Sequence, residues 1–268
     1  MNHATAPHLD EALLLRSDAH GITTLTLNRP KARNSLSAAL MAELQRTLDA
    51  IAADPEARVV VLAGNGPGFC AGHDLKELRA ADFEDGFVKA LFAQCSQLMQ
   101  RIVTLPVPVI AKVHGIATAA GCQLVASCDL AVAAEAARFA TPGVNIGLFC
   151  STPMVALSRK VGRKAAMEML LTGDLFSASW AAERGLVNRV VADGELDAAT
   201  HALARQIADR SKATVRIGKE AFYRQLEMPL AAAYDYTSEV MADNMAFRDA
   251  REGITAFLDK RQPYWSDR

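Results

Sequence analysis

Two segments place small residues directly after an apolar run and just before a stretch with helical patterning. The first spans 64–78 (GNGPGFCAGHDLKEL) and the second spans 114–129 (HGIATAAGCQLVASCD). Small residues let a ligand approach the backbone closely, and the first N–H groups of a helix have no partner inside the helix. Two such N–H groups that converge on one point can stabilise a developing oxyanion. A single turn of this kind can also serve only to reverse the chain.

Other nucleotide and metal motifs do not fit these segments. A dinucleotide-binding turn beginning at Gly64 and Gly66 would need a third glycine at position 69, which is Phe69. No GxxxxGK[ST] motif and no zinc-like spacing of Cys and His occur. The five cysteines are odd in number and stand among apolar or small residues, which favours reduced thiols over disulfides. We therefore expect neither a metal nor a tightly bound cofactor.

Charge and composition exclude two further classes. The net charge of −1 provides no basic field for nucleic acid, and no run of about 18 apolar residues predicts a membrane span. The N-terminus has neither the basic region nor the long apolar region of a secretory signal. We expect a cytoplasmic protein.

The hydrophobic pattern predicts an α/β core. Residues 22–27 alternate Thr with apolar residues, while 58–63, 107–114 and 130–132 are short apolar runs typical of strands buried on both faces. Ser37 is the expected cap of a helix that continues to about residue 53. Strand and helix signals in this order favour a mostly parallel sheet. From about 194 the chain is rich in helix formers, so we predict a core over 1–200 and a helical region over 201–268.

Taken together, several segments resemble the crotonase (enoyl-CoA hydratase/isomerase) superfamily. These are LNRPKARNSLS (27–37), GFCAGHDLKEL (68–78), the long stretch 109–133, FATPGVNIGL (139–148) and EGITAFLDKR (252–261). The similarity covers roughly 12–265, and CQLVASCD with FATPGVNIGLFCSTP is similar to the enoyl-CoA-hydratase-domain-containing protein 3 group within the superfamily. The resemblance implies a spiral of β-β-α turns, a helical C-terminal trimerisation region, and assembly as a homotrimer or a dimer of trimers. It also implies an acyl-CoA thioester as partner, with coenzyme A as part of the substrate.

The resemblance assigns site residues by motif position. The backbone N–H groups of His73 and Ala120 would bind the thioester carbonyl oxygen. Phe257 and Lys260 would complete the adenine pocket from a neighbouring subunit. The remaining coenzyme A contacts would come from Arg29, Lys31, Arg33, Ala71, Asp74, Leu75 and Lys76.

The chain departs from the family at the acid/base pair. A hydratase needs two groups that exchange protons, and the family supplies two glutamates; here those positions are Gln123 and Gly143. Ser151 lies about where some relatives carry an active aspartate, and Asn145 is close in sequence, but an N-cap at Ser151 is the better interpretation. The His73 side chain is a further candidate, because methylmalonyl-CoA decarboxylase relatives share the AGHD turn.

These observations support an acyl-CoA protein with an oxyanion hole and an altered or absent acid/base pair. One hypothesis is an enzyme that needs only enolate stabilisation, such as a decarboxylase, or a thioesterase that uses a positioned water. The other is a non-catalytic acyl-CoA binder or assembly subunit. Ordinary hydration is expected to be weak or absent.

Overall fold

The computed structural model describes residues 12–268. A six-stranded sheet has the order β1-β2-β3-β4-β6-β9, parallel except for the β1–β2 hairpin. Its strands are β1 (Leu14–Ala19), β2 (Ile22–Leu27), β3 (Val59–Gly64), β4 (Val109–Val113), β6 (Leu130–Ala134) and β9 (Arg189–Val191). A second sheet, with the order β5-β7-β8, contains β5 (Ile116–Thr118), β7 (Arg138–Ala140) and β8 (Phe176–Ser177).

Successive turns of the chain add one strand to each sheet and then a helix. β4 is followed by β5 and then α4 (Ala120–Ser127), and β6 is followed by β7 and then α5 (Ser151–Leu157). The β5–β7 pair is parallel, with Ile116 opposite Arg138. This repeat is the expected β-β-α spiral, and the expected α/β class is confirmed.

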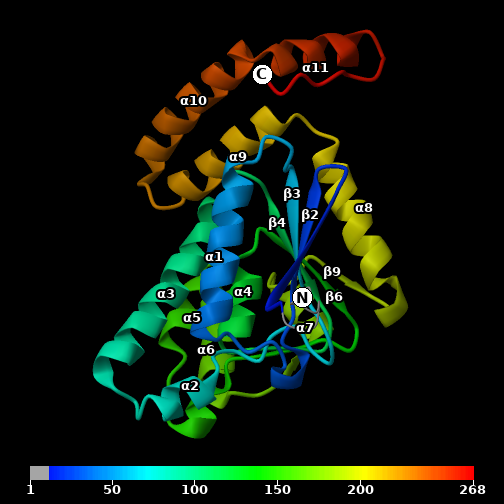
Figure 1. The fold of residues 1–268 in the computed structure, drawn as a ribbon. Helices are drawn as coiled ribbons and strands as arrows, with labels where there is room; N and C mark the ends of the chain where they lie inside the picture. The colour runs from blue at the N-terminus through cyan, green and yellow to red at the C-terminus, as the bar shows by residue number, and fades with distance from the viewer. Residues whose placement is uncertain (1–11) are drawn as a thin grey trace, which may run out of the picture.

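The helices pack on both faces of the large sheet (Figure 1). On one face lie α1 (Ala38–Ala53), α3 (Asp85–Thr104) and α4, which bury Leu25, Val60 and Leu62. The opposite face carries α8 (Leu196–Ala208), which covers Val59 and Val61. Alternate residues of β3 thus enter two separate cores, as the apolar run at 58–63 indicated.

Helix α1 shows how a local signal starts an element. The Ser37 side chain accepts a hydrogen bond from the Leu40 N–H at 3.2 Å, as expected of an N-cap. Leu40, Met41, Leu44, Leu48 and Ile51 are all buried. The remaining helices of the core are α2 (Leu75–Ala80), α6 (Arg163–Thr172) and α7 (Ala178–Glu183), with 3-10 turns at Pro30–Ala32, Pro142–Ile146 and Asp193–Glu195.

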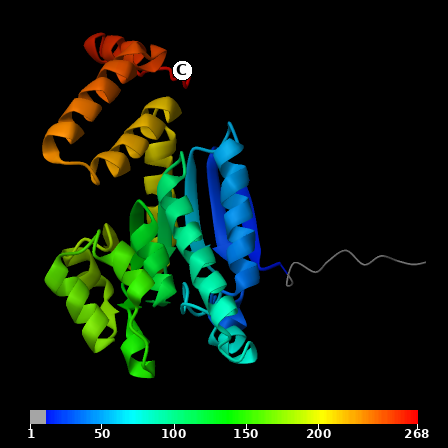
Figure 2. The same cartoon turned by 90° about the vertical axis from the view of Figure 1, so that its left-hand side faces the viewer.

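The C-terminal helices extend beyond the end of the sheet (Figure 2). They are α9 (Lys212–Gln225), α10 (Leu230–Ala246) and α11 (Arg248–Leu258). The boundary expected at residue 200 falls inside α8, which packs on the sheet. Large apolar side chains on the projecting helices are exposed, among them Leu230, Tyr234, Met241, Ile254, Phe257 and Leu258.

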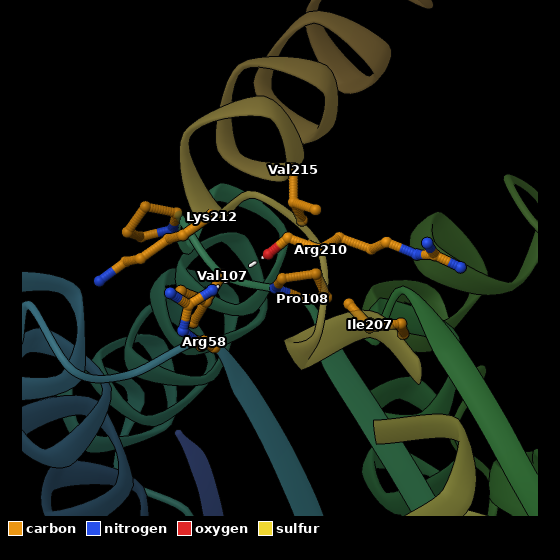
Figure 3. A pocket seen from close by; sticks show the side chains of 8 residues that line it. Arg58, Val107, Pro108, Ile207, Arg210, Lys212 and Val215 are labelled. Carbon is orange, nitrogen blue, oxygen red and sulfur yellow. Dashed lines mark hydrogen bonds between the residues drawn. The ribbon is translucent and has the colours of Figure 1, made fainter. Parts of the chain in front are cut away.

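Arg58 joins the core to the start of this region (Figure 3). Its guanidinium donates to the carbonyl oxygens of Ala208 at 3.2 Å and Arg210 at 3.0 Å. The cavity at this junction measures only about 10 Å³, room for roughly one water molecule. It is too small for a substrate.

Candidate active site

The two small-residue turns of the sequence lie against each other. The Cys70 N–H donates to the Ile116 carbonyl at 3.1 Å, and the Thr118 N–H donates to the Cys70 carbonyl at 2.9 Å. Only glycine fits at position 121, because a Cβ there would lie 2.1 Å from the Cys70 oxygen. The Thr118 hydroxyl adds a 3.1 Å bond to the Ala71 carbonyl. Residues 70–74 and the start of α4 are thereby held together.

Two backbone N–H groups are left without partners at this junction. The Leu36 N–H donates to the Gly72 carbonyl at 2.7 Å, and the Leu36 carbonyl accepts from the Asp74 N–H at 3.1 Å. The N–H of His73, which lies between Gly72 and Asp74, therefore points to the other side of its chain. Ala120 is the first residue of α4 and has no acceptor within the helix. Within residues 12–268 neither N–H donates a hydrogen bond.

Gly72 brings these two groups side by side. It has a φ of +97°, and a Cβ there would lie 2.9 Å from the Ala119 Cβ and 3.4 Å from the Ala120 nitrogen. A side chain at position 72 would therefore separate the two turns. The arrangement can present two donors to one oxygen atom.

The His73 imidazole is packed against Phe92. Its ring meets the Phe92 ring edge-on, with 5.1 Å between the centroids. Both ring nitrogens are shielded from solvent and have no hydrogen-bond partner in the described part of the chain. Burial lowers the pKa of His73 to about 4, so the imidazole is neutral at physiological pH. Position 73 can thus offer a ligand its backbone N–H but not its side chain.

Neither acid/base position carries a carboxylate. Gln123 lies on the first turn of α4, 4% exposed, and its amide oxygen has no hydrogen-bond partner among residues 12–268. Gly143 is buried in the turn Pro142–Ile146. A Cβ at Gly143 would lie 2.5 Å from the Leu148 carbonyl oxygen and 2.9 Å from the Cys150 sulfur. The loop at 143–150 packs tightly around Gly143, the position of the second acid/base group, so no side chain fits there.

The two polar candidates that follow are engaged elsewhere. Asn145 is exposed, and its amide nitrogen lies 3.5 Å from the Gly173 carbonyl. The expectation that Ser151 is an N-cap is wrong: Cys150 holds that position, and the Ser151 hydroxyl donates to the Phe149 carbonyl at 3.3 Å. The Met154 N–H donates to the Cys150 carbonyl at 2.9 Å, so the helix begins one residue earlier than expected, with Pro153 in its first turn.

The basic turn before α1 is built around a buried asparagine that the sequence reading did not single out. Asn34 is 0% exposed and accepts from the Arg29 N–H at 2.8 Å. Its amide donates at 2.8 Å to the carbonyls of both Asn65 and Gly68. Asn34 thereby ties the turn at 29–34 to the first glycine-rich segment. The only sequence signal for it is its place in the motif LNRPKARNSLS.

The expected coenzyme A contacts fall into two groups. The first group already has partners within the chain: the Arg29 guanidinium binds Asp74 at 2.7 Å and the Ser35 carbonyl. The second group is exposed, and Lys31 and Arg33 on the same turn belong to it. Leu75 and Lys76 are exposed at the start of α2.

Phe257 and Lys260 lie at the end of α11, on the opposite side of the molecule from α2 (Figure 1). Phe257 is 82% exposed. One chain does not bring these two residues to the site.

The thiols and possible metal ligands lie apart from this chemistry. Cys70, Cys95, Cys122, Cys128 and Cys150 are all free and buried. Burial raises the pKa of Cys70, Cys95 and Cys122 to about 12, which keeps them as thiols. In residues 12–268 no group of three His, Cys, Asp or Glu side chains is placed to hold a metal ion. No helix in this range is long and apolar enough to span a bilayer.

The fold and the paired turns define a class of protein. The sequence profile described as enoyl-CoA hydratase/isomerase matches residues 17–268. The chain therefore belongs to the enoyl-CoA hydratase/isomerase family, the crotonase superfamily, as the motifs predicted.

The narrower similarity points to one group within that family. The human mitochondrial enoyl-CoA hydratase domain-containing protein 3 is 51% identical over 246 residues, 92% of this chain and 81% of the human protein. Its crystal structure has a TM-score of 0.92 at 49% identity, covering 95% of this chain and all of that one. An enoyl-CoA hydratase from Mycobacterium smegmatis has a TM-score of 0.93 at 55% identity, covering 95% of this chain and 99% of the other. The similarity to this group is confirmed, while the expected cytoplasmic location is not, since the vertebrate relatives are named mitochondrial.

Proposed function

We propose that this protein binds an acyl-CoA thioester and stabilises negative charge on its carbonyl oxygen through the N–H groups of His73 and Ala120. The observation that carries the proposal is the pair of unpartnered N–H groups held side by side across Gly72. Breaking the Cα–carboxylate bond in a decarboxylation moves its electron pair onto the thioester oxygen as an enolate, and attack of water on the carbonyl carbon moves the π electrons there as a tetrahedral oxyanion. One such donor is worth roughly 3 kcal/mol of barrier in either case. Coenzyme A is then part of the substrate, and no tightly bound cofactor is needed.

Ordinary hydration should be weak or absent. Acid/base groups contribute about 10²–10⁴-fold to such reactions, and an amide at Gln123 exchanges no proton near neutral pH. The short distances from a Cβ at Gly143 to Leu148 and Cys150 support the absence of the second group. Reactions that need chiefly an oxyanion hole fit this site better, namely decarboxylation of an acyl-CoA or attack on the thioester by a positioned water.

A non-catalytic acyl-CoA binder is the second candidate. It is supported by the buried, neutral imidazole of His73, which leaves the amide of Gln123 as the polar side chain next to the paired donors. The two candidates differ in turnover and not in binding.

The coenzyme A moiety would contact two subunits. Lys31, Arg33, Ala71, Leu75 and Lys76 would serve from one chain, with Asp74 and Arg29 holding the turn. Phe257 and Lys260 would come from a neighbour, because they lie far from the site of their own chain. The exposed apolar residues of α9–α11 would be covered in a homotrimer or a dimer of trimers.

Calorimetric titration with crotonyl-CoA tests the oxyanion hole through Ala120→Pro. Proline has no N–H, so it removes one donor; because Ala119 has a ψ of −120°, outside the range favoured before proline, circular dichroism and the urea midpoint must show that the variant folds. We expect about a tenfold or greater loss of affinity. The matched control is Arg163→Pro at the first position of α6, which should bind as the wild type does. Equal affinity of Ala120→Pro and wild type, with both folded, would refute the proposed hole.

A second measurement concerns the missing acid/base pair. Wild type should hydrate crotonyl-CoA far more slowly than a typical enzyme, and Gln123→Glu should gain activity by about tenfold or more. Only position 123 is suitable, since Gly143 has no room for a side chain. Hydration by wild type at an ordinary enzymatic rate would show that another residue supplies the proton.

A further inference from the structure

A large cavity lies along α4 and has Gln123 in its lining. It measures about 1320 Å³ and lies between α3, α4, α5 and α9. Helix α4 contributes Gln123, Ala126 and Ser127, which share one face of the helix. This volume exceeds that of an ordinary small-ligand pocket, so a long acyl group fits in it.

The walls of the cavity near Gln123 are largely apolar. Met99 and Val103 of α3 face Ala126 of α4, and Ala156 of α5 and Phe222 of α9 complete this part. Such a lining favours methylene groups. The amide oxygen of Gln123 has no hydrogen-bond partner among residues 12–268, whereas the Ser127 hydroxyl on the same face donates to the Gln123 backbone carbonyl at 2.8 Å.

Basic residues outnumber acidic ones in the lining of the cavity. Six lysine or arginine side chains face two glutamates, Glu220 and Glu227. Ion pairs use three of the cations: Arg101 with Asp49, Arg159 with Glu227, and Lys219 with Asp129. Three cations therefore remain against Glu220, namely Lys160, Arg216 and Arg224.

Lys160 is the most enclosed of these three and is held at the far end of α4. Its ammonium donates to the Tyr223 hydroxyl at 3.2 Å and lies 5.2 Å from the centre of that ring. Tyr223 in turn donates to Asp129 at 2.9 Å, and Asp129 also accepts from Lys219 at 2.8 Å. Asp129 thus fixes Tyr223, and Tyr223 positions Lys160. No carboxylate in the described residues pairs with Lys160, so its remaining donors can bind an anion.

Helix α4 gives the distance from the paired N–H groups to Asp129, which Lys160 reaches through the Tyr223 hydroxyl. Ala120 starts the helix, Ser127 ends it, and Asp129 follows two residues later. At about 1.5 Å per residue this span is roughly 10–14 Å, which an extended alkyl chain of about eight to eleven carbons covers.

We infer that the acyl group of the thioester ends in a carboxylate, so that the substrate class is the medium-chain ω-carboxyacyl-CoA thioesters. The thioester carbonyl lies at the His73 and Ala120 N–H groups, the chain passes Gln123 along α4, and the terminal carboxylate meets Lys160. This inference rests on the proposed function, since it needs the thioester to bind at the paired turns.

Calorimetric titration with two CoA thioesters of equal length tests the inference. One is decanoyl-CoA and the other is the monothioester of CoA with decanedioic acid. Wild type should bind the carboxylated thioester about tenfold more tightly, the size of one charge-assisted hydrogen bond. Lys160→Met keeps the alkyl stem and removes the charge, so the ratio of the two affinities should fall close to one.

The control and a second variant keep the outcomes distinct. Lys89→Met removes an exposed cation on α3 outside the cavity and should leave the ratio unchanged. Tyr223→Phe removes the hydroxyl that positions Lys160 and should lower the ratio if Lys160→Met does not fold. Equal affinities in wild type, or a ratio that neither cavity variant changes, would overturn the inference and leave the proposed function standing. If neither thioester binds to wild type, the proposed function fails and the inference fails with it.

Discussion

At the scale of the residue, His73 combines two groups that the structure separates. Its N–H faces the Ala120 N–H, while its imidazole is packed on Phe92 with a pKa of about 4. An unfolded histidine has a pKa near 6.5, so the unfolded chain binds more protons between these two values. The free energy of unfolding should therefore fall by about 3 kcal/mol as the pH is lowered from 6.5 to 4.

His73→Ala tests this separation of roles. The variant keeps the backbone N–H, so crotonyl-CoA affinity should stay close to that of the wild type, and the pH dependence contributed by the imidazole should disappear. Urea denaturation at several pH values between 4 and 7 measures this dependence. His201→Ala, an exposed histidine on α8, is the matched control and should retain the wild-type slope. A large loss of thioester affinity in His73→Ala would mean that the side chain takes part in binding.

At the scale of the element, the start of α4 holds a strained residue. Ala119 precedes the helix with φ +50° and ψ −120°, a backbone conformation that glycine adopts readily and alanine does not. Ala119→Gly should relieve this strain and raise the free energy of unfolding by about 1 kcal/mol. Ala126→Gly, the same change inside the helix, should lower it by a similar amount. The urea denaturation midpoints of the two variants measure these changes in the free energy of unfolding. A lower midpoint for Ala119→Gly than for the wild type would show that the strain is absent.

The elements differ in how far the sequence predicts them. Helix α1 and the buried strands β2, β3, β4 and β6 were expected, because caps and apolar runs are local signals. Strands β5, β7 and β8 were missed, since two or three residues are too few to show a period. Strand β1 was also missed, because it is half exposed and shows no alternation. The closed loop at Gly143 depends on contacts with Leu148 and Cys150, which no pattern in the sequence reveals.

At the scale of the whole molecule, the sequence predicted the class of site but not its surroundings. The motifs identified His73 and Ala120 through short backbone turns that are local in sequence. The cavity at Lys160 forms because α9 packs near the end of α4. Tyr223 of α9 bonds Asp129, which follows α4, and these two residues are 94 positions apart in the sequence. Such pairings depend on the tertiary fold, so composition and periodicity do not show them.

One buried carboxylate links α11 to the C-terminal tail. Asp249 at the start of α11 is 1% exposed and accepts from the Ser266 N–H at 2.7 Å, the Ser266 hydroxyl at 2.8 Å and the Asp267 N–H at 2.9 Å. Asp267 then binds Arg58 and the Lys212 N–H, so the C-terminal tail ties α11 to the core.

Asp249→Ala should therefore loosen α10 and α11 while leaving the sheet intact. Removing the shared acceptor of three half-buried donors should cost about 3 kcal/mol, confined to the C-terminal helices. Hydrogen exchange should become faster by about a hundredfold in α10 and α11 and stay slow in β4. Asp243→Ala, at an exposed site on α10, should exchange as the wild type does. Uniformly faster exchange across the sheet would mean that the tail stabilises the entire fold, and unchanged exchange would mean that the helices are fixed by other contacts.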